Sequence, residues 1–186
     1  MLGTRDLEEI VNRIPYQEIE GSTFLITGAN GCLASNMVHA LMYLNACYLN
    51  KKCTVIALCR NSEKANFVFK KYLKYEFFKL CIQNVEEKIC LDEEVDYIIH
   101  AASNAVTSDF NEMPVDILNA NIIGTHNLLE FSKTKNLKGF LFFSSGAVYG
   151  EIPDNISRLR EKEVFSLAYL QKRNCYAEGK RAGEAL

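Results

Sequence analysis

Short apolar runs alternate along this chain with longer segments of helical periodicity. Such alternation is typical of βαβ units, in which parallel strands form a sheet and helices cover it. The runs are almost continuously hydrophobic, as expected of strands that are buried on both faces. We therefore expect an α/β protein with a doubly wound parallel sheet and helices on both of its faces. The expected strands are Phe24–Thr27, Thr54–Cys59, Phe77–Ile82, Tyr97–Ala101 and Gly139–Ser144.

Segments of helical period fill the gaps between these strands. An amphipathic stretch, Asp6–Ile14, should pack on the sheet as an extra helix, so we expect a helical extension over 1–21 and the sheet domain over 22–186. The polar stretch Gly150–Ser166 is predicted to be a long loop, and loops of that size are usually functional. The last helix reaches Leu186 without a C-terminal capping signal, so we expect further sequence after it. The expected helices are Cys32–Leu49, Ser62–Tyr75, Pro114–Thr134 and Leu167–Leu186, with a short one at Glu86–Cys90.

Composition and charge exclude several classes of protein. The 186 residues are 48% hydrophobic and 24% charged, as in one globular domain that can bury a core without metal or disulfide support. The formal net charge of -2 offers no basic field to a nucleic acid. The seven cysteines, with no C-x-x-C pair, indicate reduced thiols, a cytoplasmic location and no metal site. No leader-like start and no apolar run of about 20 residues is present, so we expect no membrane partner.

The turn after the first strand carries the first functional signal. Residues 24–35 read FLITGANGCLAS, with the spacing G-x-x-G-x-x-A between strand and helix. Glycine lets the backbone N–H groups approach a pyrophosphate, and the helix N-terminus adds a partial positive charge. A lone G-x-x-G is common in plain turns, but its position after the first strand favours a dinucleotide site. The expected cofactor contacts are Gly28, Asn30, Gly31, Cys32 and Leu33.

The second and third strands should hold the adenosine end of the cofactor. An acidic residue after the second strand would bind the ribose hydroxyls of NAD, whereas arginine suits the 2′-phosphate of NADP. Residues 57–61 read ALCRN without a carboxylate, so Arg60 leaves NADP open, unless it is a solvated loop charge. Gln83 and Asn84 could hydrogen-bond the adenine, although Asn84 equally suits a turn, and the next residue, Val85, is also expected to contact the cofactor.

Three further motifs follow at or beyond the ends of later strands, where a doubly wound sheet binds its ligand. The motif HAAS presents the small residues Ala101, Ala102 and Ser103 to a cofactor, and the motif SSGAVYG covers 144–150. In the third motif, YAEGK, Tyr176 and Lys180 are four apart and share a helix face.

Together these motifs suit proton and hydride chemistry. A phenol with an ordinary pKa near 10 is a poor base, but a nearby ammonium favours its phenolate. Ser145 could then hydrogen-bond the same substrate oxygen as Tyr176, with Lys180 as the electrostatic partner. A lone Y-x-x-x-K is frequent on solvated helices, but the four motifs in this order indicate a redox site.

As a set, the motifs resemble the N-terminal part of an extended short-chain dehydrogenase/reductase of the NAD-dependent epimerase/dehydratase family. The matching segments are TGANGCLA, HAAS, NIIGT with NLLE, SSGAVYG and YAEGK, from about residue 22 to the end. The resemblance implies a Rossmann domain that binds NAD, or NADP, and acts on a nucleotide-diphosphate sugar. It implies Tyr176 as the catalytic acid/base, Lys180 as its partner and a ribose ligand, and Ser145 on the substrate hydroxyl. Asn121 would lie beneath the site, and the helices 114–134 and 167–186 would form a homodimer.

Departures from the family pattern bear on the exact reaction. Family dehydratases have an Asp-Glu pair where this chain has Gly146 and Ala147, and decarboxylases of UDP-glucuronate have a glutamate at the second position. Nucleotide-sugar 4-epimerases and reductases have small residues there, so we expect one of these activities. A decarboxylase or a dTDP-glucose 4,6-dehydratase-like enzyme remains an alternative. Members are also longer, with a C-terminal lobe that supplies most sugar contacts, so an inactive fragment or a non-catalytic dinucleotide-binding module is a second alternative.

Overall fold

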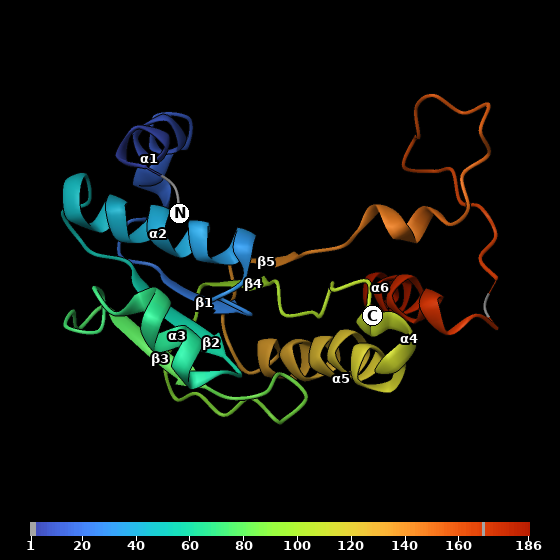
Figure 1. The fold of residues 1–186 in the computed structure, drawn as a ribbon. Helices are drawn as coiled ribbons and strands as arrows, with labels where there is room; N and C mark the ends of the chain where they lie inside the picture. The colour runs from blue at the N-terminus through green and yellow to red at the C-terminus, as the bar shows by residue number, and fades with distance from the viewer. Residues whose placement is uncertain (1–2, 169) are drawn as a thin grey trace.

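The fold is a five-stranded sheet in which every strand pair is parallel. The computed structural model describes residues 3–168 and 170–186 (Figure 1). The strand order is β3-β2-β1-β4-β5, so the direction of winding reverses between β1 and β4. This confirms the doubly wound parallel sheet. The strands are β1 (Thr23–Thr27), β2 (Thr54–Cys59), β3 (Phe78–Ile82), β4 (Tyr97–His100) and β5 (Gly139–Phe142).

Helices cover both faces of the sheet, because successive strand side chains point to opposite sides. Phe24 and Ile26 of β1 belong to the core shared with α2 (Cys32–Cys47) and α3 (Ser62–Phe69). Leu25, between them, packs in the second core, with α5 (Pro114–Ser132). Figure 1 shows α2 and α5 on opposite sides of the sheet. The helix α6 (Cys175–Ala185) packs against α5.

Two expected helices differ from the structure. The segment expected as a helix at Glu86–Cys90 consists of turns and irregular chain, because the side chain of Asn84 accepts a hydrogen bond from the N–H of Glu86 and so favours a turn. The last helix begins at Cys175, not at Leu167, and follows the 3-10 helix η3 (Lys172–Asn174). The side-chain amide of Asn174 donates to the carbonyl oxygen of Ala168 at 3.0 Å and holds the preceding chain in a non-helical path.

Smaller differences concern the ends of elements and short helices. The sequence predicts one helix over Ser62–Tyr75, but α3 ends at Phe69 and turns follow. The elements α2, α5, β4 and β5 also end one or two residues before their expected ends. Three short helices have no periodic pattern in the sequence: η1 (Tyr16–Ile19), α4 (Asp109–Glu112) and η2 (Gly146–Tyr149).

The N-terminal helix α1 (Thr4–Val11) packs on α2, not directly on the sheet as expected. Val11 is fully buried in the α2-side core, and Tyr43 of α2 donates its hydroxyl hydrogen to Glu8 at 3.2 Å. Because α2 and α3 already cover this face of the sheet, α1 forms an outer layer over α2 (Figure 1). Within the part of the chain that the structure describes, none of the helices is both long and apolar enough to span a bilayer.

Candidate active site

The glycine turn after β1 has the geometry of a phosphate-binding turn. Gly28 has a φ of +60°, and a Cβ there would lie 2.7 Å from the Cα of Ala102. Glycine is therefore required, because the chain directly after β4 lies against the turn. Gly31 is the N-cap of α2 and supplies no side-chain cap to the first turn of that helix. Cys32 and Leu33 are exposed at this end, so the fit to a pyrophosphate is good: a close backbone approach and a positive helix end.

The expected adenosine residues lie at the neighbouring strand ends. Arg60 and Asn84 line a cavity of about 520 Å³ at the carboxyl ends of β2 and β3. Glu87 also lines it and brings a carboxylate that the end of β2 lacks. Its position in the irregular segment after β3, and not at a strand end, gave no signal in the sequence. Val85 is buried instead, against Gly124 of α5.

His100 joins the glycine turn to α5 through a buried chain of hydrogen bonds. Its Nδ1 lies 2.9 Å from the hydroxyl of Thr27, and its Nε2 lies 3.0 Å from the hydroxyl of Thr125. Thr125 donates its hydrogen to the carbonyl oxygen of Asn121 at 2.5 Å, so it must accept from Nε2–H. Nδ1 then accepts from Thr27, which in turn accepts from the N–H of Ala102 at 3.2 Å. Burial lowers the pKa of His100 to about 3, with the charge of Lys180 as a smaller cause.

Asn121 links the small residues after β4 to the helix packing. Its side-chain oxygen accepts from the hydroxyl of Ser103 at 3.0 Å, and its amide donates to the carbonyl oxygen of Ile117 at 2.8 Å. A Cβ on Gly179 would lie 3.0 Å from the Cβ of Asn121. The absence of that Cβ lets α6 lie close to α5. Ala101 is half-buried in this region.

The three expected catalytic residues lie on α6 and shortly after the end of β5. Lys180 is only 2% exposed, and its Nζ donates to the carbonyl oxygen of Phe143 at 2.6 Å, two residues before Ser145. The same Nζ lies 5.9 Å from the ring centroid of Tyr176 and 4.8 Å from that of Phe142. Burial lowers the pKa of Lys180 to about 8. The ammonium therefore still predominates at pH 7.

Ser145 and Tyr176 are each held by local contacts. Ser145 is the N-cap of η2, and its hydroxyl accepts from the N–H of Ala147 at 3.2 Å. The turn η2 packs against α6. The half-buried ring of Tyr176 stacks on Phe110 of α4 at 5.0 Å between centroids. Sequence reasoning missed Phe110, because α4 is a short helix inside a segment without a clear period.

A model of the NAD-dependent epimerase/dehydratase family matches residues 24–186. This chain belongs to that family. Curated family relatives include a dTDP-D-glucose 4,6-dehydratase of Dictyostelium discoideum, 34% identical over 138 residues, or 70% of this chain and 31% of the relative. UDP-glucuronic acid decarboxylase 6 of Arabidopsis thaliana is 30% identical over 162 residues, or 87% of this chain and 44% of the relative.

Solved structures share the fold. The epimerase Mth375 of Methanothermobacter thermautotrophicus has a TM-score of 0.73 at 22% identity, and the match covers 91% of this chain and 47% of that one. The UDP-N-acetylglucosamine 4-epimerase of Methanobrevibacter ruminantium M1 has a TM-score of 0.71 at 23% identity, with 89% and 49% covered. Thus the chain spans about a third to a half of the length of these four proteins.

Proposed function

We propose that this protein carries the cofactor and catalytic half of an NAD-dependent nucleotide-sugar oxidoreductase, most like a 4-epimerase or a reductase. The observation that carries the proposal is the buried ammonium of Lys180. It lies on one helix with Tyr176 and donates a hydrogen bond to the backbone of Phe143, in the segment that leads from β5 to Ser145. A buried cation that faces a phenol and a hydroxyl-bearing turn suits acid/base chemistry at a substrate oxygen.

Each residue has a distinct role in this proposal. Tyr176 exchanges a proton with a sugar hydroxyl. Lys180 favours the phenolate form of Tyr176 by its charge, and a pKa near 8 keeps that charge at neutral pH and removes it as the pH rises above 8. Ser145 donates a hydrogen bond to the same sugar oxygen and orients it. These three groups give a base, its electrostatic partner and an orienting donor.

Bound NAD would supply the hydride acceptor and donor. In this chain, the turn 28–33 would hold the pyrophosphate, Asn84 would contact the adenine, and Lys180 would contact the ribose hydroxyls. A UDP-glucuronic acid 4-epimerase from Bacillus cereus, which shares the fold, is described in complex with UDP-glucuronic acid and NAD. The position of Arg60 beside the cavity keeps NADP as the alternative.

The cofactor site is tested by substitution of Gly31. A valine there would place side-chain atoms against the approach of the pyrophosphate, and a Cβ would already lie 3.1 Å from the carbonyl oxygen of Gly28. We expect Gly31→Val to abolish NAD binding in calorimetry, while Gly146→Val, at a glycine with open space around it, leaves binding intact. Equal binding by Gly31→Val and the parent would exclude this site. If NADP bound more tightly than NAD and Arg60→Ala removed the difference, the cofactor would be NADP.

The residues after Ser145 favour the hypothesis that the protein is a 4-epimerase or a reductase. By the family resemblance, dehydratases have an Asp-Glu pair at the positions of Gly146 and Ala147. Decarboxylases have a glutamate at the position of Ala147. Open space surrounds Gly146, so a larger acidic side chain would fit there, but the sequence does not supply one. Dehydration or decarboxylation would need an acid from elsewhere in the protein, and the two named relatives with those activities make them the alternatives to assay.

Turnover is tested with Tyr176→Phe, which removes only the phenol oxygen. In the longest in-frame form of the protein, we expect the rate to fall by about a hundred-fold to ten-thousand-fold, because a positioned acid/base is lost. Lys180→Met should lower the rate and weaken cofactor binding, and Ser145→Ala should have the smallest effect. The assay follows nicotinamide absorbance and keto-sugar trapping with uridine-, thymidine-, guanosine- and cytidine-diphosphate sugars. Tyr75→Phe, at an exposed tyrosine far along the chain, is the matched control.

A second outcome would change the class of protein. If the parent bound dinucleotide, converted none of these sugars and did not differ from Tyr176→Phe, the protein would be a non-catalytic dinucleotide-binding module. The share of its relatives that the chain spans, 31% and 44% for the two named above, is the observation that keeps this candidate.

A further inference from the structure

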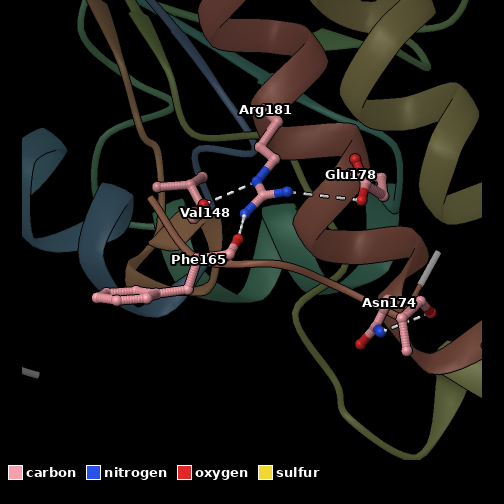
Figure 2. Close-up of polar contacts among 6 residues, drawn as sticks. Val148, Phe165, Asn174, Glu178 and Arg181 are labelled. Atoms are coloured by element: carbon pink, nitrogen blue, oxygen red, sulfur yellow. Dashed lines mark hydrogen bonds and ion pairs between the residues drawn. The ribbon is translucent and has the colours of Figure 1, made fainter. Parts of the chain in front are cut away.

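Arg181 extends from α6 to the polar loop 150–166. Its Nε donates to the carbonyl oxygen of Val148 at 2.7 Å, and one terminal nitrogen donates to the carbonyl oxygen of Phe165 at 2.9 Å (Figure 2). The other terminal nitrogen lies 3.7 Å from the carboxylate of Glu178 on the same helix. One guanidinium therefore holds two separate points of the backbone.

These two points lie at the base of the loop. The N–H of Phe165 donates to the carbonyl oxygen of Tyr149 at 2.8 Å. The N–H of Glu151 donates to the carbonyl oxygen of Ser166 at 3.1 Å. Between them, Gly150 has a φ of +86°, and a Cβ there would lie 2.4 Å from the carbonyl oxygen of Phe165. The loop is closed where it starts and ends, and the guanidinium fastens this closed base to α6.

Side chains of α6 hold the chain both before and after Ser145. The carbonyl that accepts from Nε belongs to η2, which begins directly after Ser145. Before Ser145, Lys180 donates to the carbonyl oxygen of Phe143, and the hydroxyl of Ser144 donates to the carboxylate of Glu184. The segment that carries Ser145 is thus held from both directions by side chains of α6.

We propose that Arg181 is a positioning residue for the hydride-transfer site. Its side chain holds Ser145 and the base of the 150–166 loop in place relative to Tyr176 and Lys180. This inference rests on the proposed function. Arginine suits the task because its planar fork reaches two carbonyls at once, whereas lysine offers one compact charge. The pair with Glu178 adds little, since the two side chains are 26% and 39% exposed. The two carbonyl contacts carry the effect.

The first test measures the loop itself in the 186-residue chain. Arg181→Met should raise amide exchange at 148–151 and tryptic cleavage at Arg158, Arg160 and Lys162. We expect an increase of about tenfold, because two charge-assisted hydrogen bonds are lost. Arg173→Met is the matched control: Arg173 is 61% exposed and pairs with Glu151 of the same loop at 3.8 Å. It should stay within about twofold of the parent, as expected of an exposed ion pair.

The second test separates positioning from simple stability, in the form of the protein that turns over. Arg181→Met should lower kcat by about tenfold to a hundredfold, because small misplacements of a reacting group have effects of that size. The Kd for NAD should stay within about twofold, since the glycine turn is built without Arg181. Arg181→Lys, which keeps the charge and the fold and can reach one carbonyl, should recover part of kcat. If Arg181→Met does not fold, this variant alone must show the reduced kcat.

The outcomes are distinct. An unchanged kcat in Arg181→Met with an active parent overturns this inference and leaves the proposed function intact. A parallel loss of NAD binding and kcat also overturns it, because the residue would then only support the fold. A parent that converts no nucleotide sugar overturns the proposed function, and the positioning role with it.

Discussion

A single histidine tautomer connects the glycine turn after β1 with helix α5. Only one neutral tautomer of His100 fits its partners. Thr125 donates its hydroxyl hydrogen to a backbone carbonyl and so accepts from Nε2–H, which leaves Nδ1 to accept from Thr27. Thr27 directly precedes Gly28, and Thr125 lies on the helix that carries Asn121. The neutral imidazole therefore fixes β1, β4 and α5 at the edge of the sheet where the family motifs gather. The sequence motif HAAS pointed to this edge through its small residues, but the partners of the histidine come from elements far away in the chain.

This arrangement predicts a loss of stability in acid. The pKa of His100 is about 3 in the folded protein, against an ordinary 6.5, so between these values the unfolded chain binds a proton that the folded one does not. The free energy of unfolding should fall with decreasing pH in this window, by about 1.4 kcal/mol per pH unit for one such group. Burial, together with the charge of Lys71, lowers the pKa of His39 to about 4, and that residue should add to the slope.

The measurement is urea unfolding between pH 6.5 and 4.5. His100→Gln should lower stability at every pH, because the two threonines lose their partner, and should also reduce the slope by about one proton. His126→Gln, which removes an exposed histidine of α5, is the control. An unchanged slope in His100→Gln would show that this imidazole is protonated alike in both states.

At the scale of elements, the strands were the most predictable part. A strand covered on both faces must be apolar throughout, so a run such as TVIALC identifies β2 without knowledge of its neighbours. The last helix was less predictable. Its start depends on the contact of Asn174 with Ala168, and its close packing on the neighbouring elements depends on Gly179 and Gly183. Gly183 lies against the tip of the Phe142 ring, where a Cβ would be 2.6 Å from Cζ. Neither contact has a periodic signal.

The candidate site shows the same division. Motif residues that act through local geometry, such as Gly28 and Lys180, could be located by sequence because strand ends and helix turns bring them to one edge. Arg181 could not, because its role depends on two backbone carbonyls, and a carbonyl has no residue type. Glu87 was missed for a similar reason: an irregular segment, and not a strand end, brings it to the cavity beside Arg60.

At the scale of the molecule, two apolar surfaces lie at different places. On the edge strand β5, Leu141 is 46% exposed, whereas Phe140, whose side chain points to the opposite face of the sheet, lines a cavity together with Leu129 and Leu186. On α5, Val115 and Ile123 are 64% and 42% exposed. They are eight residues apart on one helix, close to two full turns, and so share a face. This second surface belongs to the segment 114–134 that the family resemblance assigns to a subunit contact.

We therefore expect a homodimer through α5 and α6, with the exposed face of α5 at its centre. Light scattering of the chain should give twice the monomer mass, and Ile123→Glu should give a monomer, because a buried unpaired carboxylate at an interface is strongly unfavourable. Phe67→Glu is the control: Phe67 is 83% exposed on α3, which packs on the face of the sheet opposite α5. If both variants dissociate the assembly, association is general adhesion of apolar surface. If the parent is a monomer at high concentration, the face of α5 has no role in self-association, and the dimer is excluded for this chain.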